Sequence, residues 1–337
     1  TASLAGSDEL VTALFKRLGV ARVDSLEALM EALKVLHVLG PLSGGRMGAM
    51  STSGGDLTLL ADALGPDLSM PPLSENVAQD LQAVIHPLMK AANPFDFQMF
   101  DWNDEEAMAR NFTAFMQETF DVALCVLDYP REDICDQSTW AGAERGFVRA
   151  AKETGTKSAV LSTFSDTMSE GVAERLMKDQ VATLAGIDAG VAGIQAAVDV
   201  GAAWRCPVCP PLLTGFGHSP MDGVEVLDEA ASKHLIAEKG VPVPSGQVVG
   251  PADVVEAAES LGYPVVVKAL GIAHKTEKGG VRLGLADAHA VSAAIAEMSD
   301  LSSSFLVEKM VEGVVAELIV GVARDEQFGP YLLVGGG

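Results

Sequence analysis

Basic residues are scarce in this sequence: 23 lysines and arginines stand against 46 aspartates and glutamates, giving a formal net charge of −23. Phosphate backbones bind to basic faces, so we expect no nucleic-acid partner. The acidity itself indicates a solvated surface rather than a particular chemistry. An anionic ligand would need a locally basic or N–H-rich pocket.

Long apolar runs are also missing. The sequence contains no run of about 18 apolar residues and no visible signal peptide, so we expect a cytoplasmic protein without a membrane partner. Aromatic residues make up 5% of the 337 residues, whereas 48% are hydrophobic. The length of the chain is enough for two or more domains. Alanine and glycine are abundant, which suits helices that pack closely on a parallel sheet.

Cysteine is rare as well, with four in the chain. Cys206 and Cys209 have CxxC spacing, but a structural zinc site requires a second close pair, and Cys125 and Cys135 lie further apart. We therefore expect reduced thiols and no metal site within this chain.

The first part of the chain alternates strands and helices. Two helices are predicted within residues 7–36, with Ser25 as an N-cap, and Ser74 is predicted to cap a later helix. Apolar strands that alternate with helices indicate a doubly wound parallel sheet. The predicted strands are 46–52, 121–130, 157–164 and 181–186; the helices are 57–65, 74–90, 104–120, 138–155, 169–178 and 187–204.

A proline- and glycine-rich linker at 205–225 precedes a second domain. Its pattern predicts an α+β layout with antiparallel strands. The helices are expected at 228–239, 252–262 and 287–300, and the strands at 264–268, 281–285, 305–310, 316–325 and from 331 onward.

A β-branched run in this second domain ends in Lys268, and the loop after it carries His274, Lys275, Gly279 and Gly280. A lysine supplies a point charge for phosphates, and glycines let backbone N–H groups approach the oxygens. The alternative is a β-hairpin with a glycine turn and a snorkelling lysine.

Further along, Glu308 ends an apolar strand, and residues 307–311, including Met310, form an extended segment suited to an adenine edge. Glu317 could accept hydrogen bonds from ribose hydroxyls. Together with Lys268 and its loop, these residues come in the order used by the ATP-grasp fold, which predicts ATP binding.

Five segments resemble the ADP-forming acyl-CoA synthetases, relatives of succinyl-CoA synthetase. They are TASLAGSDELVTALFKRLGV (after the family's histidine motif), STSGGDLTLLADAL, the NPFD loop at 93–96, LDEAASKHLIAEKGVPVP and KALGIAHKTEKGGVRLGL. The resemblance implies a flavodoxin-like sheet followed by a partial ATP-grasp domain. Its boundaries would be 1–39 (tail of the preceding subdomain), 40–210 (CoA-ligase domain), 211–225 (linker) and 226–337 (incomplete ATP-grasp domain).

The family converts a carboxylic acid, CoA and ATP to acyl-CoA, ADP and phosphate through an acyl phosphate and a phosphohistidine, with Mg²⁺. The resemblance thus implies these substrates and a homo-oligomer. It places the phosphohistidine just before Thr1 and the magnesium ligands beyond Gly337, so we expect an internal piece of a longer chain.

His274 matches the histidine that carries a second phosphoryl group in one branch of the family. The alternative is a loop histidine that only hydrogen-bonds phosphate or backbone. The other histidines are interpreted as structural or exposed; they are His37, His86, His218, His234 and His289.

By the same resemblance, Ser53, Gly54 and Gly55 could cradle the phosphorylated imidazole at a helix N-terminus. Without the family match, a plain strand-to-helix turn would be preferred. Asn93 and Asp96 match a loop near the acyl substrate.

Aromatic residues follow that loop and could suit an aryl acid or, by cation–π contact, an onium acid. Phe97 and Phe100 are expected to fill the core instead, and Trp102 is open between pocket and core.

Two other functions stay open. The first is a non-catalytic regulatory module that senses acyl-CoA or nucleotide, against which the intact ATP-site residues argue. The second is an ATP-grasp ligase with another acceptor, against which the SGG and NPFD loops argue.

Overall fold

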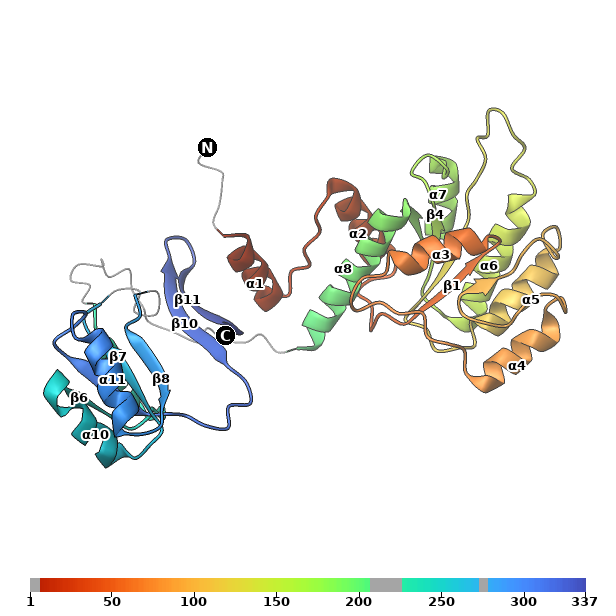
Figure 1. Ribbon diagram of the computed structural model, residues 1–337. Coiled ribbons are helices and arrows are strands. Elements are labelled where there is room, and N and C mark those ends of the chain that lie inside the picture. The colour runs from red at the N-terminus through yellow and green to blue at the C-terminus, as the bar shows by residue number, and fades with distance from the viewer. Residues whose placement is uncertain (1–6, 207–225, 273–277) are drawn as a thin grey trace. The chain divides into compact units, whose positions relative to one another are not determined.

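The computed structural model describes residues 7–206, 226–272 and 278–337. The chain divides into two compact units, Thr1–Leu212 and Leu213–Gly337 (Figure 1). Among the described residues, no helix is both long and apolar enough to cross a bilayer. The finer boundaries predicted within residues 1–225 stay a prediction.

Unit 1 contains a five-stranded parallel sheet with the order β2-β1-β3-β4-β5. This is the flavodoxin-type order, in which the chain changes direction between β1 and β3. The predicted doubly wound, flavodoxin-like sheet is therefore confirmed. The strands are β1 Met47–Ser51, β2 Phe95–Asp96, β3 Val122–Val126, β4 Ser158–Ser162 and β5 Val181–Ala185.

Helices cover both faces of this sheet because its strands are apolar on both sides. Met50 and Cys125 pack with α4, α5, α6 and α7, whereas Ala49 and Leu124 pack with α2, α3 and α8. The helices are α1 Asp8–Leu18, α2 Leu26–Val38, α3 Gly54–Asp62, α4 Glu75–Val84, α5 Glu105–Phe115, α6 Trp140–Thr154, α7 Glu170–Lys178 and α8 Ile187–Arg205.

Three helices of unit 1 end three or more residues earlier than predicted, namely α3, which ends at Asp62, α4 and α5. Helix α4 stops at Val84 rather than continuing to residue 90, because Pro87 disfavours helical backbone in the residues before it. Helix α5 stops at Phe115, and Glu118 beyond it accepts a hydrogen bond from the Ser74 N–H at 2.6 Å. Ser25 caps α2 as predicted, whereas the Ser74 side chain makes no capping hydrogen bond.

Unit 2 contains a four-stranded antiparallel sheet, β6-β9-β7-β8, and a separate β10-β11 hairpin. This confirms the α+β prediction; only the edge strand β6 was missed. Its elements are α9 Glu229–Glu238, β6 Gly246–Val249, the 3₁₀ turn Pro251–Asp253, α10 Val254–Leu261, β7 Val265–Ala269, β8 Val281–Leu285, α11 Ala288–Met298, β9 Phe305–Lys309, β10 Leu318–Asp325 and β11 Gly329–Gly336.

Candidate active site

Strand alternation places Lys268 and Glu308 on one face of the sheet in unit 2. In the antiparallel register, Lys268 lies opposite Leu306, and Glu308 lies opposite Val266, so the two charged residues are diagonal neighbours. The other face, which includes Val267, packs against α10 and α11. The predicted nucleotide residues therefore face away from the apolar core.

Helix α9 adds two charged side chains to this face. The Lys268 Nζ lies 2.5 Å from Glu229 Oε1 and 2.9 Å from Glu308 Oε2. The Lys233 Nζ lies 2.5 Å from Glu308 Oε1 and 3.0 Å from Glu229 Oε1. Each lysine thus contacts both carboxylates, and we call Glu229, Lys233, Lys268 and Glu308 the four-charge cluster. Asp228 caps α9 by accepting from the Ala231 N–H at 2.8 Å.

Burial makes the pairing within this cluster necessary. The Glu308 side chain is only 4% exposed, and an unpaired carboxylate at such depth would be strongly unfavourable. Burial alone would lower the pKa of Lys268, but its hydrogen bonds to Glu229 and Glu308 outweigh this, so the pKa is raised. Lys268 is therefore a permanent cation at neutral pH.

Sequence reasoning predicted Lys268 and Glu308 but missed their partners on α9. A signal was present, because Glu229 and Lys233 are four residues apart and so lie on the same side of the helix. It did not indicate which strand residues this pair would meet.

Gly246 of the neighbouring strand β6 makes room for Glu308. A Cβ at Gly246 would lie 2.8 Å from Glu308 Cγ and 2.9 Å from the Val307 carbonyl oxygen. The absence of a side chain there allows the Glu308 carboxylate to turn toward the two lysines.

The described end of the predicted phosphate loop has the backbone that glycine favours. Gly279 has a φ of 68°, a left-handed conformation. Its carbonyl accepts from the Arg282 guanidinium at 2.7 Å, and the Gly280 carbonyl accepts from the Ala269 N–H at 2.8 Å. The second of these bonds joins the loop to the end of β7 beside Lys268. His274 and Lys275 lie outside the described residues.

The segment predicted for adenine is partly used by the sheet. The Lys309 N–H donates to the Ser245 carbonyl at 2.9 Å, and the Met310 N–H donates to the Pro264 carbonyl at 3.1 Å. An adenine edge would therefore need this segment's carbonyls or later N–H groups. Glu317 is exposed just before the β10-β11 hairpin.

In unit 1, the Ser53–Gly55 turn lies where the sheet changes direction between β1 and β3, a usual ligand position in such folds. Helix α3 begins at Gly54, and the Ser53 hydroxyl accepts from the Asp56 N–H at 3.3 Å. The Ser51 hydroxyl in turn accepts from the Ser53 N–H at 3.1 Å. A helix N-terminus with this geometry can hold an anion.

Strand β2 brings Asp96 to the same turn. Asp96 pairs with Ser51 in the parallel register, and a Cβ at Gly54 would lie 3.4 Å from Asp96 Oδ2. Two segments that were predicted separately thus meet here.

Asn93 serves the backbone around that turn. Its amide nitrogen donates to the Met47 and Pro71 carbonyls, both at 2.8 Å, and its oxygen accepts from the Ala49 N–H at 3.1 Å. Two of these bonds fix the chain before β2 against β1, and the third joins it to the segment between α3 and α4.

The aromatic residues after this loop separate into core and surface. Phe97 is buried as expected, whereas Phe100 is 46% exposed and stacks on His86 with ring centroids 3.9 Å apart. The prediction that Phe100 fills the core is therefore wrong. Trp102 is buried and meets Trp140 edge to face at 5.5 Å, so its ring belongs to the core.

The other histidines of the described part are exposed. They are His37, His234 and His289; His218 lies outside it.

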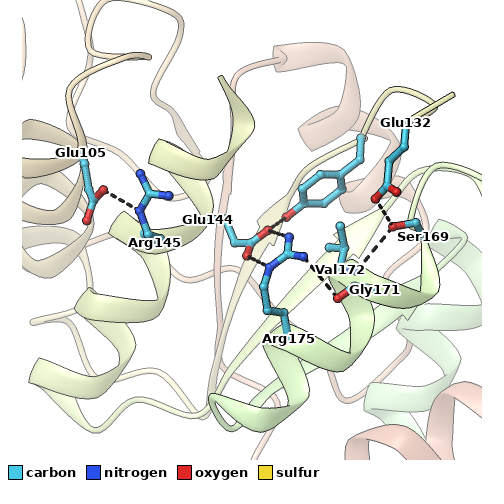
Figure 2. Close-up of polar contacts among 9 residues, drawn as sticks. Glu105, Glu132, Glu144, Arg145, Ser169, Gly171, Val172 and Arg175 are labelled. Carbon is cyan, nitrogen blue, oxygen red and sulfur yellow. Dashed lines mark hydrogen bonds and ion pairs between the residues drawn. The ribbon is translucent and has the colours of Figure 1, made fainter. Parts of the chain in front are cut away.

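A second charge cluster, which sequence reasoning missed, joins the buried Glu144 of α6 to the partly exposed Arg175 of α7. Figure 2 shows the Arg175 guanidinium holding both oxygens of Glu144, at 2.9 and 3.1 Å. The Tyr129 hydroxyl donates to the same carboxylate at 3.0 Å. Burial, together with the negative charge of Glu144, raises the pKa of Tyr129, so the phenol stays protonated. We call Tyr129, Glu144 and Arg175 the tyrosine cluster.

A cavity of about 540 Å³ opens beside the tyrosine cluster. Its basic side chains are engaged by carboxylates: Arg145 by Glu105, Lys152 by Asp179 and Arg149 by Glu106 and Glu153. The surroundings thus stabilise the packing of α6 and α7 rather than offer free cations.

No cluster suited to a metal ion occurs in the described part of the chain. Cys125 is buried, which raises the pKa of its thiol, whereas Cys135 and Cys206 are exposed. Cys209 lies outside the described residues.

The sequence is similar to a known domain family and to several curated proteins. The sequence model of the ATP-grasp domain matches residues 220–337, which confirms the fold predicted for unit 2. ADP-forming acetate–CoA ligase I of Archaeoglobus fulgidus is 26% identical, over 100% of this chain and 50% of the relative. The β subunit of ADP-forming acetate–CoA ligase I of Pyrococcus furiosus is 30% identical over 120 residues, which are 32% of this chain and 52% of that subunit.

A solved structure agrees on the fold. A crystal structure of a Pyrococcus horikoshii OT3 protein matches with a TM-score of 0.50 and 22% identity, covering 60% of this chain and 46% of that chain. The chain spans about half the length of the curated relatives that it matches along its whole length.

Proposed function

Because this chain is a homologue of the ADP-forming acyl-CoA synthetases, we propose that it supplies the nucleotide site and part of the acyl-transfer site of such an enzyme. The reaction converts a carboxylic acid, CoA and ATP to acyl-CoA, ADP and phosphate. The observation that carries the proposal is the position of Lys268, which ends a strand beside the Gly279-Gly280 backbone within the ATP-grasp match.

In this proposal, Lys268 neutralises the phosphates of ATP, and the glycine backbone allows N–H groups to approach their oxygens. Phosphoryl transfer needs little covalent help from protein, so positioning and charge neutralisation are the main tasks of these residues. Glu317 would accept from the ribose hydroxyls, and Met310 would lie along the adenine.

The turn at Ser53, Gly54 and Gly55 would hold the phosphoryl group at the N-terminus of α3, as a phosphohistidine or an acyl phosphate. Asp96, which lies beside Gly54, would accept hydrogen bonds from the groups that hold the substrate carboxyl and so orient them. His274 would be a second phosphoryl carrier, and Lys275 a further cation of the phosphate loop. A homo-oligomer remains part of the proposal.

Mg²⁺ would enter this site with ATP and neutralise phosphate charge. The described carboxylates nearest to Lys268 do not fit it as ligands, because Glu229 and Glu308 both face ammonium groups. Glu229 and Glu308 therefore act on the lysines rather than on a metal ion.

Binding of ATP to the full chain tests the proposal. Replacing Lys268→Met should weaken ATP binding about 10- to 100-fold, the usual effect of losing a charged hydrogen bond. Isothermal titration calorimetry measures the change, and Lys239→Met, an exposed residue at the C-cap of α9, is the control for charge alone. An affinity of the Lys268→Met variant within twofold of the wild type would contradict the assignment.

A further inference from the structure

Helix α9 is fastened to the sheet by charged contacts. None of its residues, all of which the structure describes, is buried. Its Glu229 and Lys233 are nevertheless about three-quarters covered, with 26% and 25% of their side chains exposed, because they lie against Lys268 and Glu308. The helix therefore meets the nucleotide residues through charge.

The four-charge cluster is balanced, with two ammonium groups and two carboxylates. A phosphate that approaches Lys268 is repelled by Glu229 and Glu308 and must compete with them for the ammonium group, since both lie within 3 Å of it. Lys233 contacts the same two carboxylates and offsets their charge. In a partly buried site such charges interact more strongly than they would in water.

We propose that Glu229 and Lys233 are positioning residues of the nucleotide site, and that the net charge of the four-charge cluster sets the affinity for the polyphosphate of a nucleoside triphosphate. Lys233 holds the carboxylates so that Lys268 can turn to phosphate, whereas Glu229 competes for Lys268. This inference rests on the proposed function, since it requires that Lys268 bind phosphate.

The test measures ATP and inorganic tripolyphosphate binding to the full chain by displacement of a fluorescent ATP analogue. Tripolyphosphate isolates the phosphate contacts from those of the base and ribose. Lys233→Met lowers the cluster charge by one and should weaken both ligands about tenfold. Glu229→Gln raises it by one and should tighten both about threefold or more.

The double variant, Glu229→Gln with Lys233→Met, restores the balance of charge and should return to within about threefold of the wild type. Lys233→Arg keeps the charge and should also retain binding. Lys239→Met removes one charge from the end of the same helix outside the cluster and should bind like the wild type.

Three outcomes would overturn the inference. In the first, both single variants weaken binding and the double variant binds more weakly still, as a purely structural role would give. In the second, Glu229→Gln does not tighten binding, and in the third, Lys239→Met weakens binding as much as Lys233→Met does. If Lys233→Met fails to fold by circular dichroism, Glu229→Gln and Lys233→Arg decide alone. A wild-type chain that binds neither ligand would overturn the proposed function, and this inference with it.

Discussion

The tyrosine cluster and the four-charge cluster, each centred on a buried glutamate, are built from different cations. The tyrosine cluster holds one carboxylate, Glu144, with the rigid fork of Arg175 and a phenol hydroxyl. The four-charge cluster holds two carboxylates with the flexible ammonium groups of Lys233 and Lys268. Arginine matches a carboxylate in a fixed planar geometry, whereas lysine is a point charge that can change partners.

Because of this difference, we interpret the tyrosine cluster as a structural contact between helices and the four-charge cluster as part of a binding site. The bidentate Arg175 contact from α7 and the Tyr129 hydrogen bond from a loop satisfy both oxygens of Glu144, which leaves little reason to rearrange. In the four-charge cluster, each lysine divides its contacts between two carboxylates, so a phosphate can replace one of these partners while the other lysine still holds the carboxylates. If the comparison holds, variants of the first cluster should change stability, and variants of the second should change ligand affinity.

The largest expected effect on stability is at Arg175. Arg175→Met would leave the buried Glu144 with only the Tyr129 hydroxyl of the partners described here, at a cost of about 2–3 kcal/mol in the free energy of unfolding. Urea unfolding of the full chain measures this, and hydrogen exchange should place the loss in α7. Arg110→Met, an exposed arginine on α5, is the control. A loss below about 0.5 kcal/mol, within the range of ordinary surface substitutions, would remove the distinction between the clusters.

A smaller effect, on both properties, is expected at Gly246. Gly246→Ala places a Cβ 2.8 Å from Glu308 Cγ, and such overpacking costs about 1–3 kcal/mol. ATP affinity should fall together with hydrogen-exchange protection of β6 and β9.

Gly250→Ala is the matched control for Gly246→Ala, because its Cβ would meet only Asp253 Oδ2, at 3.9 Å. If the Gly246→Ala variant bound ATP normally although β6 and β9 were destabilised, then the position of the Glu308 side chain would not affect ATP binding.

The smallest effect concerns Glu118, a carboxylate outside both clusters that is held mainly by backbone N–H groups, with the Arg46 guanidinium 3.9 Å away. The hydrogen bond from the Ser74 N–H lowers the pKa of Glu118. A carboxyl group whose pKa is lowered in the folded state stabilises the fold at pH values above its pKa in the unfolded chain. This stabilisation is lost as the pH falls through the folded-state pKa. Glu118→Gln should therefore cost about 1 kcal/mol at pH 7. The difference from the wild type, measured by urea unfolding, should narrow below about pH 4. A difference that did not change with pH would mean that the charge of Glu118 is not responsible.

The parallel sheet of unit 1 was predictable because its longer strands are apolar throughout and some of its helices begin at recognisable caps, such as Ser25. The strands β2 and β6 were not, since β2 has only two residues, Phe95 and Asp96, and β6 is an exposed edge strand that begins with glycine. Neither carries enough alternation to be recognised. Their positions came instead from pairing with β1 and β9.

The candidate site was predictable only in part, and for a similar reason. Lys268 lies in a distinctive strand-and-glycine pattern, but Glu229 and Lys233 look like an ordinary helical pair until the sheet is placed beside them. Phe97 and Phe100 are three residues apart in one loop, and no periodicity distinguishes the buried ring from the exposed one. Contacts between distant segments decided these cases.

A helix without buried side chains has a mechanical consequence. Segments with few apolar contacts open locally at lower free energy than the core does, so α9 should detach while the sheet of unit 2 stays folded. Of the contacts that hold α9 to the sheet, Lys268 would exchange its contact with Glu229 for phosphate, whereas Lys233 would keep its contact with Glu308. A force that pulls α9 away from the sheet would then change the affinity for the nucleotide. Binding of the nucleotide would in turn change the free energy needed to detach α9.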